Sequence, residues 1–319
     1  LPFFHSYGYT TTLWTPLVLE PAVVYHTDPR DAQVVGRLAR EHHATILMAT
    51  PTFLRIYIRR TPAEDFSTLE VVFGAAEKLP REVSDAFERK FGMRPCEAYG
   101  ATELAPLVAA NVPLSRHVPG RPADSREGTV GQPIAGCRAK ITDREGQQEL
   151  PLGQDGLLWI TGPNVMQGYL DRADLTAEVV KDGWYCTGDI ARLDPEGFIT
   201  ITGRESRFSK IGGEMVPHIS VEEAVNLELG GADGDLLAVV TAVPDRSKGE
   251  RLIVFHLPTD RSIPDLITKL RDRGLPNLWV PSATSFAEIE EIPVLGSGKL
   301  DLRRISELAR ERFAEAEPS

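Results

Sequence analysis

The sequence is poor in cysteine and contains no long apolar run. Only three cysteines occur among 319 residues, and no Cys-x-x-Cys pair is present. An odd number without paired spacing argues against a disulfide framework or a structural zinc site, and favours a reducing compartment. No stretch approaches the roughly 18 apolar residues that a membrane-spanning helix needs. We therefore expect a cytoplasmic protein. The first residues, Leu1-Pro2-Phe3-Phe4, do not resemble a signal peptide, and we expect the chain to be part of a longer one.

Basic residues are scarce relative to acidic ones. The chain holds 35 Lys and Arg against 46 Asp and Glu, a formal net charge of −11. Phosphate contacts need clustered basic side chains, so nucleic acid is not an expected partner. The hydrophobic fraction of 42% together with 25% charged residues is typical of a folded globular protein. The length exceeds that of one typical domain.

The first hundred residues alternate strand-like and helix-like segments. Strands are expected at 22–25, 45–49, 70–73 and 93–98. Asp28 followed by Pro29 predicts the start of a first helix, and Thr50 predicts the cap of a second. A third helix is expected at 80–91, ending at Gly92. This alternation predicts an α/β fold with a doubly wound sheet, in which ligands bind beyond the carboxyl ends of the strands.

The pattern changes twice further along the chain. Short strands joined by turns such as 143–146 and 194–197 predict a β-rich subdomain at 116–203. A small α+β domain is expected at 204–319, with Ser220 opening a helix as part of a capping box. Its other expected elements are strands near 236–243 and 251–257 and helices near 263–273 and 301–313.

The Gly-Ser-Gly-Lys run at 296–299 resembles the end of a phosphate-binding P-loop but lacks the rest of that pattern. A P-loop needs Gly five residues before Gly298 and Ser or Thr after the lysine, where this chain has Pro293 and Leu300. Two interpretations stay open. The run is either a solvated flexible turn or a mobile loop that delivers one lysine cation to a developing phosphate charge.

Three other motifs are ambiguous when taken singly. The run Tyr99-Gly100-Ala101-Thr102-Glu103 offers a ring for a base, a hydroxyl for a phosphate and a carboxylate for Mg²⁺, but it also fits an ordinary turn. Asp189 could accept both ribose hydroxyls or could simply belong to a turn. Arg204 could reach a ribose or phosphate, or could form a surface ion pair.

Taken together and in order, these motifs resemble the adenylate-forming (AMP-binding) superfamily, which includes acyl-CoA synthetases, luciferases and peptide-synthetase adenylation domains. The matching runs cover nearly the whole chain and include Gly-Ala-Ala-Glu-Lys-Leu, Tyr-Gly-Ala-Thr-Glu, Gly-Pro-Asn-Val-Met-Gln-Gly-Tyr, Trp-Tyr-Cys-Thr-Gly-Asp and Gly-Ser-Gly-Lys. The runs 1–6, 208–216 and 295–299 are similar to the acyl-[acyl-carrier-protein] synthetase domain of bacterial 2-acylglycerophosphoethanolamine acyltransferases.

The resemblance implies a ligase that uses ATP and Mg²⁺ to activate a fatty acid as acyl-AMP. It implies transfer of the acyl group to the phosphopantetheine thiol of acyl-carrier protein, with release of AMP. A fatty acyl-CoA synthetase is the alternative enzyme, and a non-catalytic nucleotide-binding or interaction module is the alternative of another class. The narrower resemblance also implies phospholipid metabolism and a membrane-associated acyltransferase domain in the full-length parent, which would lie at the inner membrane.

The resemblance implies that residues 1–115 are an incomplete α/β part of a large adenylation domain. It also implies roles for individual residues in this part. Thr102 would contact the α-phosphate and Glu103 would hold Mg²⁺. The adenine would be bordered by Gly74, Ala75, Ala76, Tyr99 and Gly100.

Further roles fall on single residues elsewhere. Asp189 and Arg204 would hold the ribose. Lys299 would bridge the substrate carboxylate and the α-phosphate, and Gly213 would border the thiol tunnel. His5 would line the acyl or thiol entrance, unless it is only a packed histidine.

Three departures from the family pattern stand out. The Gly/Ser/Thr-rich phosphate loop ending in lysine is missing from this chain, which predicts little activity of residues 1–319 alone. Ser206 occupies the hinge position, expected near 204–206, where the family usually has Asp or Lys. Leu157 stands where Glu is usual, and this change has no clear functional interpretation.

Overall fold

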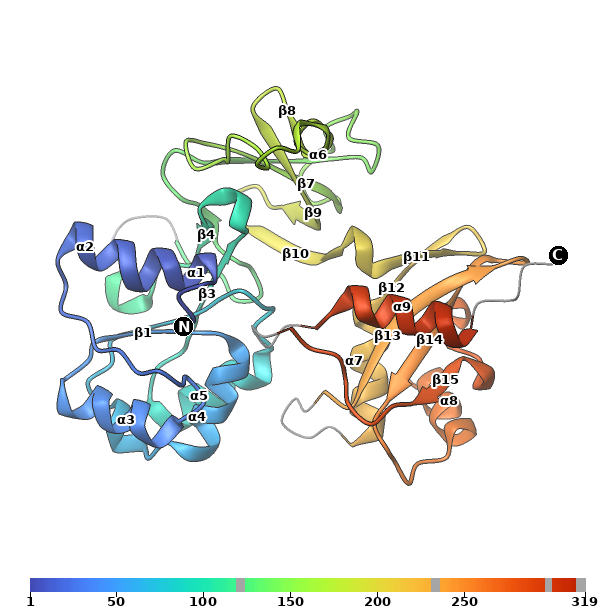
Figure 1. Ribbon diagram of the computed structural model, residues 1–319, viewed down its shortest axis with the longest axis horizontal. Helices are drawn as coiled ribbons and strands as arrows, with labels where there is room; N and C mark the ends of the chain where they lie inside the picture. The colour runs from blue at the N-terminus through green and yellow to red at the C-terminus, as the bar shows by residue number, and fades with distance from the viewer. Residues whose placement is uncertain (119–123, 231–235, 296–299, 314–319) are drawn as a thin grey trace. The chain divides into compact units, whose positions relative to one another are not determined.

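The computed structural model describes residues 1–118, 124–230, 236–295 and 300–313 (Figure 1). The chain divides into two compact units, residues 1–202 and 203–319. Residues 1–115 and 116–203, expected as separate parts, thus fall almost entirely within the first unit. Each unit is described by itself below.

The first unit begins with short helices and a five-stranded sheet. The sheet has the order β1-β2-β3-β4-β5, and β1, β2 and β3 run parallel while β4 is antiparallel to β3. Its strands are β1 (Ile46–Ala49), β2 (Val71–Gly74), β3 (Cys96–Gly100), β4 (Leu107–Ala110) and β5 (Gln132–Pro133). The helices are α1 (Ser6–Gly8), a π-helical turn (Tyr9–Trp14), α2 (Thr15–Leu19), α3 (Ala32–Glu41), α4 (Pro51–Arg60) and α5 (Arg81–Phe91). The expected α/β class is confirmed.

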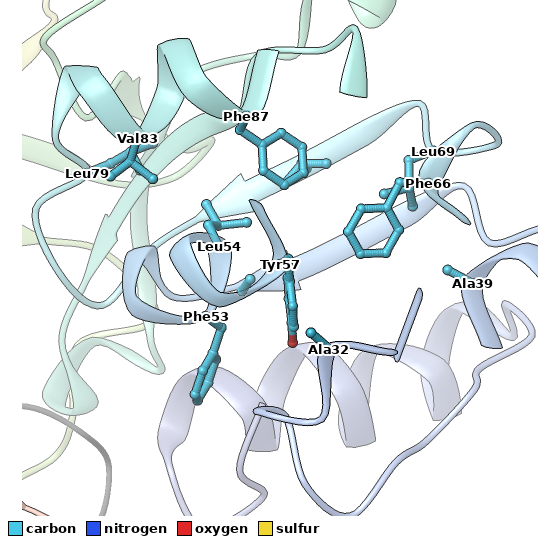
Figure 2. Close-up of a cluster of buried hydrophobic side chains, with 12 residues drawn as sticks. Ala32, Ala39, Phe53, Leu54, Tyr57, Phe66, Leu69, Leu79, Val83 and Phe87 are labelled. Carbon is cyan, nitrogen blue, oxygen red and sulfur yellow. The ribbon is translucent and has the colours of Figure 1, made fainter. Parts of the chain in front are cut away.

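A buried aromatic cluster joins α3, α4 and α5 to this sheet (Figure 2). Phe66 and Phe87 are fully buried, and their rings stack with centroids 6.3 Å apart. Tyr57 meets Phe66 edge to face and donates its hydroxyl to the Pro29 carbonyl at 2.8 Å. Leu54 completes the cluster from α4. Helix α4 therefore contributes buried side chains to the core of the first unit.

Two of the predicted helix signals are confirmed. The Thr50 side chain accepts a hydrogen bond from the Phe53 amide at 3.3 Å and caps α4. Gly92 ends α5 with a φ of 78°, in the left-handed region that glycine enters without a Cβ penalty.

Two other predictions in this unit are wrong. Residues 22–25 form no strand, and Val23 and Val24 are exposed instead of buried in a sheet. Helix α3 is capped by Asp31, which accepts from the Val34 amide at 3.3 Å, and not by Asp28. The Asp28 carboxylate is occupied locally, because it accepts from both the backbone and the side chain of Arg30.

A second sheet follows with the order β10-β9-β7-β6, and β8 pairs with β9. Its strands are β6 (Arg138–Thr142), β7 (Gly156–Thr161), β8 (Val180–Lys181), β9 (Trp184–Leu193) and β10 (Ile199–Arg204), and α6 (Ala173–Val179) precedes β8. The two predicted turns are confirmed, because Gly146 and Gly197 donate their amides to Asp143 and Asp194.

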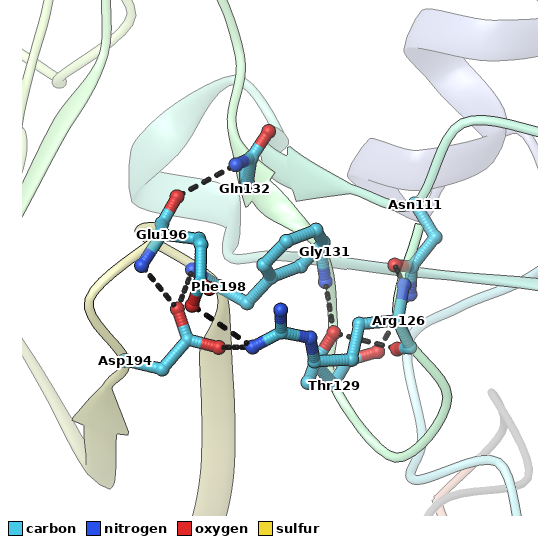
Figure 3. Close-up of polar contacts among 8 residues, drawn as sticks. All are labelled: Asn111, Arg126, Thr129, Gly131, Gln132, Asp194, Glu196 and Phe198. Atoms are coloured by element: carbon cyan, nitrogen blue, oxygen red, sulfur yellow. Dashed lines mark hydrogen bonds and ion pairs between the residues drawn. The ribbon is translucent and has the colours of Figure 1, made fainter. Parts of the chain in front are cut away.

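Arg126 holds the loop before β5 against the turn between β9 and β10 (Figure 3). Its guanidinium lies 4.5 Å from the Phe198 ring centroid and forms ion pairs with Asp194 and Glu196. The Arg126 amide donates to Asn111 Oδ1 at 2.8 Å, and Asn111 Nδ2 donates to the Thr129 carbonyl at 2.7 Å. These contacts connect the two sheets within the first unit.

The second unit contains a sheet of order β12-β11-β14-β13, with β15 parallel to β14. Its strands are β11 (Phe208–Ile211), β12 (Glu214–Pro217), β13 (Ala238–Asp245), β14 (Gly249–His256) and β15 (Phe286–Glu288). Its helices are α7 (His218–Leu229), α8 (Ile263–Asp272) and α9 (Leu302–Phe313). The prediction that Ser220 opens a helix is wrong. Helix α7 begins two residues earlier, directly after Pro217, which has an extended backbone with φ −77° and ψ 117° and is the last residue of β12.

A buried polar network fastens the start of this unit to α7. Arg207 Nη2 donates to Glu222 Oε2 at 2.6 Å, and the same carboxylate oxygen accepts from the Val240 amide at 2.9 Å. Ser209 Oγ lies 2.8 Å from His218 Nε2 nearby. Among the described residues, no helix is long and apolar enough to cross a membrane.

Replacing Glu222 by glutamine should unfold the second unit more easily. The change leaves the buried Arg207 charge without its carboxylate, which typically costs about 3 kcal/mol or more. Urea denaturation of the complete protein measures the effect. The control, Glu307→Gln, breaks an exposed pair with Arg303 and should change stability little. Equal effects of the two variants would contradict a structural role for the buried pair.

The second unit should lose stability in acid through His218. Burial, reinforced by the Arg207 charge, lowers the pKa of His218 to about 3. The unfolded chain therefore binds more protons between the ordinary pKa of about 6.5 and this value, and the free energy of unfolding falls as pH falls through that window. Its slope from this group is at most about 1.4 kcal/mol per pH unit. His218→Gln should flatten the acid slope; an unchanged slope would contradict this assignment.

Candidate functional site

The chain turns back sharply after β3 and places the Tyr-Gly-Ala-Thr-Glu motif at the carboxyl end of that strand. The pairing register shifts between Tyr99 and Gly100, and the chain returns as β4. A Cβ on Gly100 would lie 1.6 Å from the Pro106 carbonyl oxygen, so only glycine permits this close approach. Thr102–Leu104 forms a short 3₁₀ turn in the loop between.

Tyr99 and Asp189, which are 90 residues apart in the sequence, are hydrogen-bonded to each other. The Tyr99 hydroxyl donates to Asp189 Oδ2, and Asp189 is 2% exposed. A bulge in β9 presents Asp189. Leu157 of β7 pairs with Ile190 of β9, and Trp159 pairs with Cys186, so two steps along β7 correspond to four along the antiparallel β9. The two extra residues in β9 displace the Thr-Gly-Asp run from the regular ladder.

Thr102 lies beside the N-terminal segment that contains His5. Its hydroxyl is 3.2 Å from Ser6 Oγ, and Thr102 is exposed. His5 caps α1, because its Nδ1 accepts from the Tyr7 amide at 3.2 Å. The structure thus brings His5 and Thr102 into one region, and a helix-capping contact accounts for part of what His5 does.

Glu103 is half-buried and held by a segment far along the chain. The Tyr169 hydroxyl donates to Glu103 Oε1 at 2.8 Å, and the Met166 amide donates to the Glu103 carbonyl at 2.8 Å. The pKa of Tyr185 is raised, first by burial and then by the neighbouring Glu103 charge. Sequence reasoning missed Ser6, Tyr169 and Tyr185. A signal was present for Tyr169, because it ends the Gly-Pro-Asn-Val-Met-Gln-Gly-Tyr run, to which no role was given.

The Gly-Ala-Ala segment begins at the last residue of β2, the parallel neighbour of β3. Gly74 and Ala75 are buried, and the Ala75 amide donates to the Ala49 carbonyl at 3.2 Å. Ala76 adopts a φ of 73°, a left-handed conformation that costs an L-residue roughly 1–2 kcal/mol. Because the carboxyl ends of parallel strands meet at one sheet edge, this segment and Tyr99 share an edge.

The remaining candidates lie in the second unit or outside the described residues. Arg204 ends β10 and is exposed. Gly213 belongs to the two-residue hairpin turn between β11 and β12, where Gly212 and Gly213 have φ of 59° and 89°. These angles are those of a type I′ turn, so the fold itself requires the two glycines. Lys299 lies outside the described residues, and so does the rest of the Gly-Ser-Gly-Lys run.

A carboxyl group near this edge titrates close to neutral pH. Burial raises the pKa of Glu97, two residues before Tyr99 on β3, to about 7.

The described residues contain no group of three or more His, Cys, Asp or Glu side chains that could hold a metal. Mg²⁺ is commonly bound through one or two carboxylates and substrate phosphates, so the single carboxylate of Glu103 fits such an ion.

Comparison with known proteins places the chain in a family. The profile of the AMP-binding enzyme family matches residues 1–170, more than half of the chain. A long-chain-fatty-acid–CoA ligase of Yersinia pestis is 30% identical over 308 residues, which cover 95% of this chain and 52% of the relative. The chain thus spans about half the length of the curated relatives it matches. It belongs to the AMP-binding enzyme family.

Solved structures share the fold across nearly the whole chain. ATP-bound MatB from Rhodopseudomonas palustris matches with a TM-score of 0.81 at 23% identity, over 98% of this chain and 60% of MatB. The o-succinylbenzoate CoA synthetase MenE of Bacillus subtilis, in complex with its acyl-adenylate intermediate, matches with a TM-score of 0.78 at 23% identity, over 100% and 60%. The narrower resemblance to acyl-carrier-protein synthetase domains gains no support from these relatives.

Gly100→Ala should destabilise the first unit strongly. The new methyl group would meet the Pro106 backbone, and such overpacking typically costs about 1–3 kcal/mol and occasionally more. Thermal unfolding of the complete protein measures the loss. Gly153→Ala serves as the control, because that glycine has a φ of 84° and nothing within 4 Å of an added Cβ. A loss at Gly100 no larger than at Gly153 would contradict the close return.

Proposed function

We propose that this chain is part of an ATP-dependent ligase that activates a fatty acid as acyl-AMP and transfers the acyl group to CoA. One observation carries the proposal. Tyr99, Thr102 and Glu103 lie at the carboxyl end of β3, and three distant segments contact them through Ser6, Tyr169 and Asp189. Family membership and a relative named as a long-chain-fatty-acid–CoA ligase support the same chemistry.

The first half-reaction would join the carboxylate to the nucleotide. A fatty-acid oxygen attacks the α-phosphorus of ATP, the bond to the β-phosphate breaks, and pyrophosphate leaves. Asp189 would accept the ribose hydroxyls, and Tyr99 with Gly74–Ala76 would border the adenine. Thr102 would donate to an α-phosphate oxygen. Bound Mg²⁺, held by Glu103, would neutralise phosphate charge in this step.

The second half-reaction would use the same acyl-AMP. A thiol sulfur attacks the acyl carbonyl, the bond to the phosphate oxygen breaks, and AMP leaves. We propose that Arg204 assists at the ribose, that Lys299 serves the first step, and that Gly213 borders the thiol path in the second. Both Lys299 and Gly213 lie beyond residues 204–206, so a hinge there would exchange them.

The anchoring of Arg207 supports this hinge position. Arg207 is buried and bound to α7 through Glu222, which fixes it to the body of the second unit. A rotation at this place would therefore be absorbed before Arg207. Ser206 lacks the charge usual at the hinge position of the family, but a small residue leaves the backbone free to turn.

CoA is the favoured acceptor, and acyl-carrier protein is the second candidate. The similar protein from Yersinia pestis is named as a CoA ligase, which supports CoA as the acceptor. The runs 1–6, 208–216 and 295–299 resemble carrier-protein synthetases, which keeps the second acceptor worth testing. Thioester formation from one supplied acyl-adenylate, with each acceptor in turn, separates the two.

The complete protein should catalyse fatty-acid-dependent exchange of labelled pyrophosphate into ATP. Glu103→Gln and Lys299→Ala should each lower the rate about 10²–10³-fold, the usual effect of removing one preorganised group that stabilises the transition state. Glu70→Gln, which breaks an exposed ion pair with Arg116 in the first unit, is the control and should retain the rate. Residues 1–319 alone should exchange poorly, because the phosphate loop is missing from this sequence.

The absence of exchange by the complete wild-type protein, with fatty acids of several lengths, would contradict the ligase. It would favour a nucleotide-binding module without catalysis. Robust exchange by residues 1–319 alone would show that the phosphate loop is dispensable.

A further inference from the structure

The segment 162–169 contacts the 102–107 loop at four points. Asn164 Nδ2 donates to the carbonyls of Leu104 and Leu107, at 2.8 Å and 2.9 Å. The Met166 amide donates to the Glu103 carbonyl at 2.8 Å. The Tyr169 hydroxyl donates to Glu103 Oε1, also at 2.8 Å. Three of these bonds hold the loop backbone, and only the fourth reaches the functional carboxylate.

Tyr169 is itself fixed from behind. The Tyr169 backbone amide donates to Thr176 Oγ1 at 2.9 Å. The Thr176 hydroxyl in turn donates to the Arg172 carbonyl. Gly168 makes room for this contact, because a Cβ there would lie 2.9 Å from the Thr176 side chain. Tyr169 is therefore presented to Glu103 by a turn that packs against the start of α6.

The hydrogen bond occupies one of the two carboxylate oxygens of Glu103. A phenol donating to Oε1 restricts the direction in which the carboxylate points. The hydroxyl of the buried Tyr185 also interacts with both Glu103 and Tyr169. Two tyrosine hydroxyls therefore help to hold the carboxylate in one orientation. A carboxylate with a fixed direction binds a cation without first losing rotamer freedom.

We propose that Tyr169 is a positioning residue that orients the Glu103 carboxylate toward a divalent cation shared with the nucleotide phosphates. The inference rests on the proposed function, in which Glu103 holds Mg²⁺. It gives the Gly-Pro-Asn-Val-Met-Gln-Gly-Tyr run a specific task, namely to hold the 102–107 loop by its backbone and Glu103 by its side chain.

The test compares Tyr169→Phe with wild type in the complete protein. The Mg²⁺ concentration that half-saturates pyrophosphate exchange should rise about tenfold, the loss expected for one hydrogen bond to a charged group. The rate at saturating Mg²⁺ should stay near that of wild type. Without turnover, the affinity for Mn²⁺ in the presence of α,β-methylene-ATP, measured by electron paramagnetic resonance, should fall by a similar factor.

Two further variants guard the interpretation. Tyr57→Phe is the matched control, because it removes a tyrosine hydrogen bond of the same 2.8 Å length from the core of the first unit. It should lower thermal stability without shifting the Mg²⁺ or Mn²⁺ dependence. Thr176→Val removes the hydroxyl that holds the Tyr169 backbone, and it should shift the Mg²⁺ dependence in the same direction as Tyr169→Phe. If Tyr169→Phe does not fold, the Mg²⁺ dependence of Thr176→Val tests the inference in its place, and an unchanged dependence would overturn it.

The outcomes separate the inference from the function on which it rests. Unchanged metal dependence in Tyr169→Phe, with Mn²⁺ binding lost in Glu103→Gln, would overturn the inference and leave the proposed function intact. Undiminished Mn²⁺ binding and exchange in Glu103→Gln would overturn the inference and the role proposed for Glu103, while the ligase activity would stand; only the absence of exchange by the wild-type protein would overturn the function itself.

Discussion

The close approach of Gly100 to the Pro106 carbonyl is the constraint on which the candidate site depends. It forces the chain to reverse directly after β3, and the loop that results carries Thr102 and Glu103 at the edge of the sheet. Three distant segments meet this loop or the strand before it. Ser6 reaches Thr102, Tyr169 reaches Glu103, and Asp189 meets Tyr99. A loop without this reversal would separate the carboxylate from the ribose-binding candidate.

The elements with strong local signals were predictable from the sequence, and those set by tertiary contacts were not. Thr50 caps its helix through a local side-chain hydrogen bond and Gly92 ends its helix through a left-handed φ, and both predictions are confirmed. Asp28 failed because its carboxylate binds the neighbouring Arg30, a competition that the pattern does not reveal. Ser220 failed because Pro217 starts α7 before it.

The candidate site shows the same division. Motif order identified the family, and the family profile agrees over residues 1–170. The run that ends at Tyr169 was visible in the sequence, but the contacts of Tyr169 and Tyr185 with Glu103 were not, because they join residues far apart in the chain. Gly213 has a simpler structural explanation than the sequence suggested, since a type I′ hairpin turn needs glycine there.

Formation of an acyl-adenylate is the central claim, and the fate of the carboxylate oxygens tests it most directly. The complete protein would be incubated with ATP, CoA and a fatty acid labelled with ¹⁸O in both carboxylate oxygens, and the products analysed by mass spectrometry. The carboxylate attacks the α-phosphorus, and the thiol then displaces AMP from the acyl group. These two steps leave one ¹⁸O atom in AMP and none in pyrophosphate. Label in inorganic phosphate, with ADP as the nucleotide product, would indicate an acyl phosphate and would contradict the account.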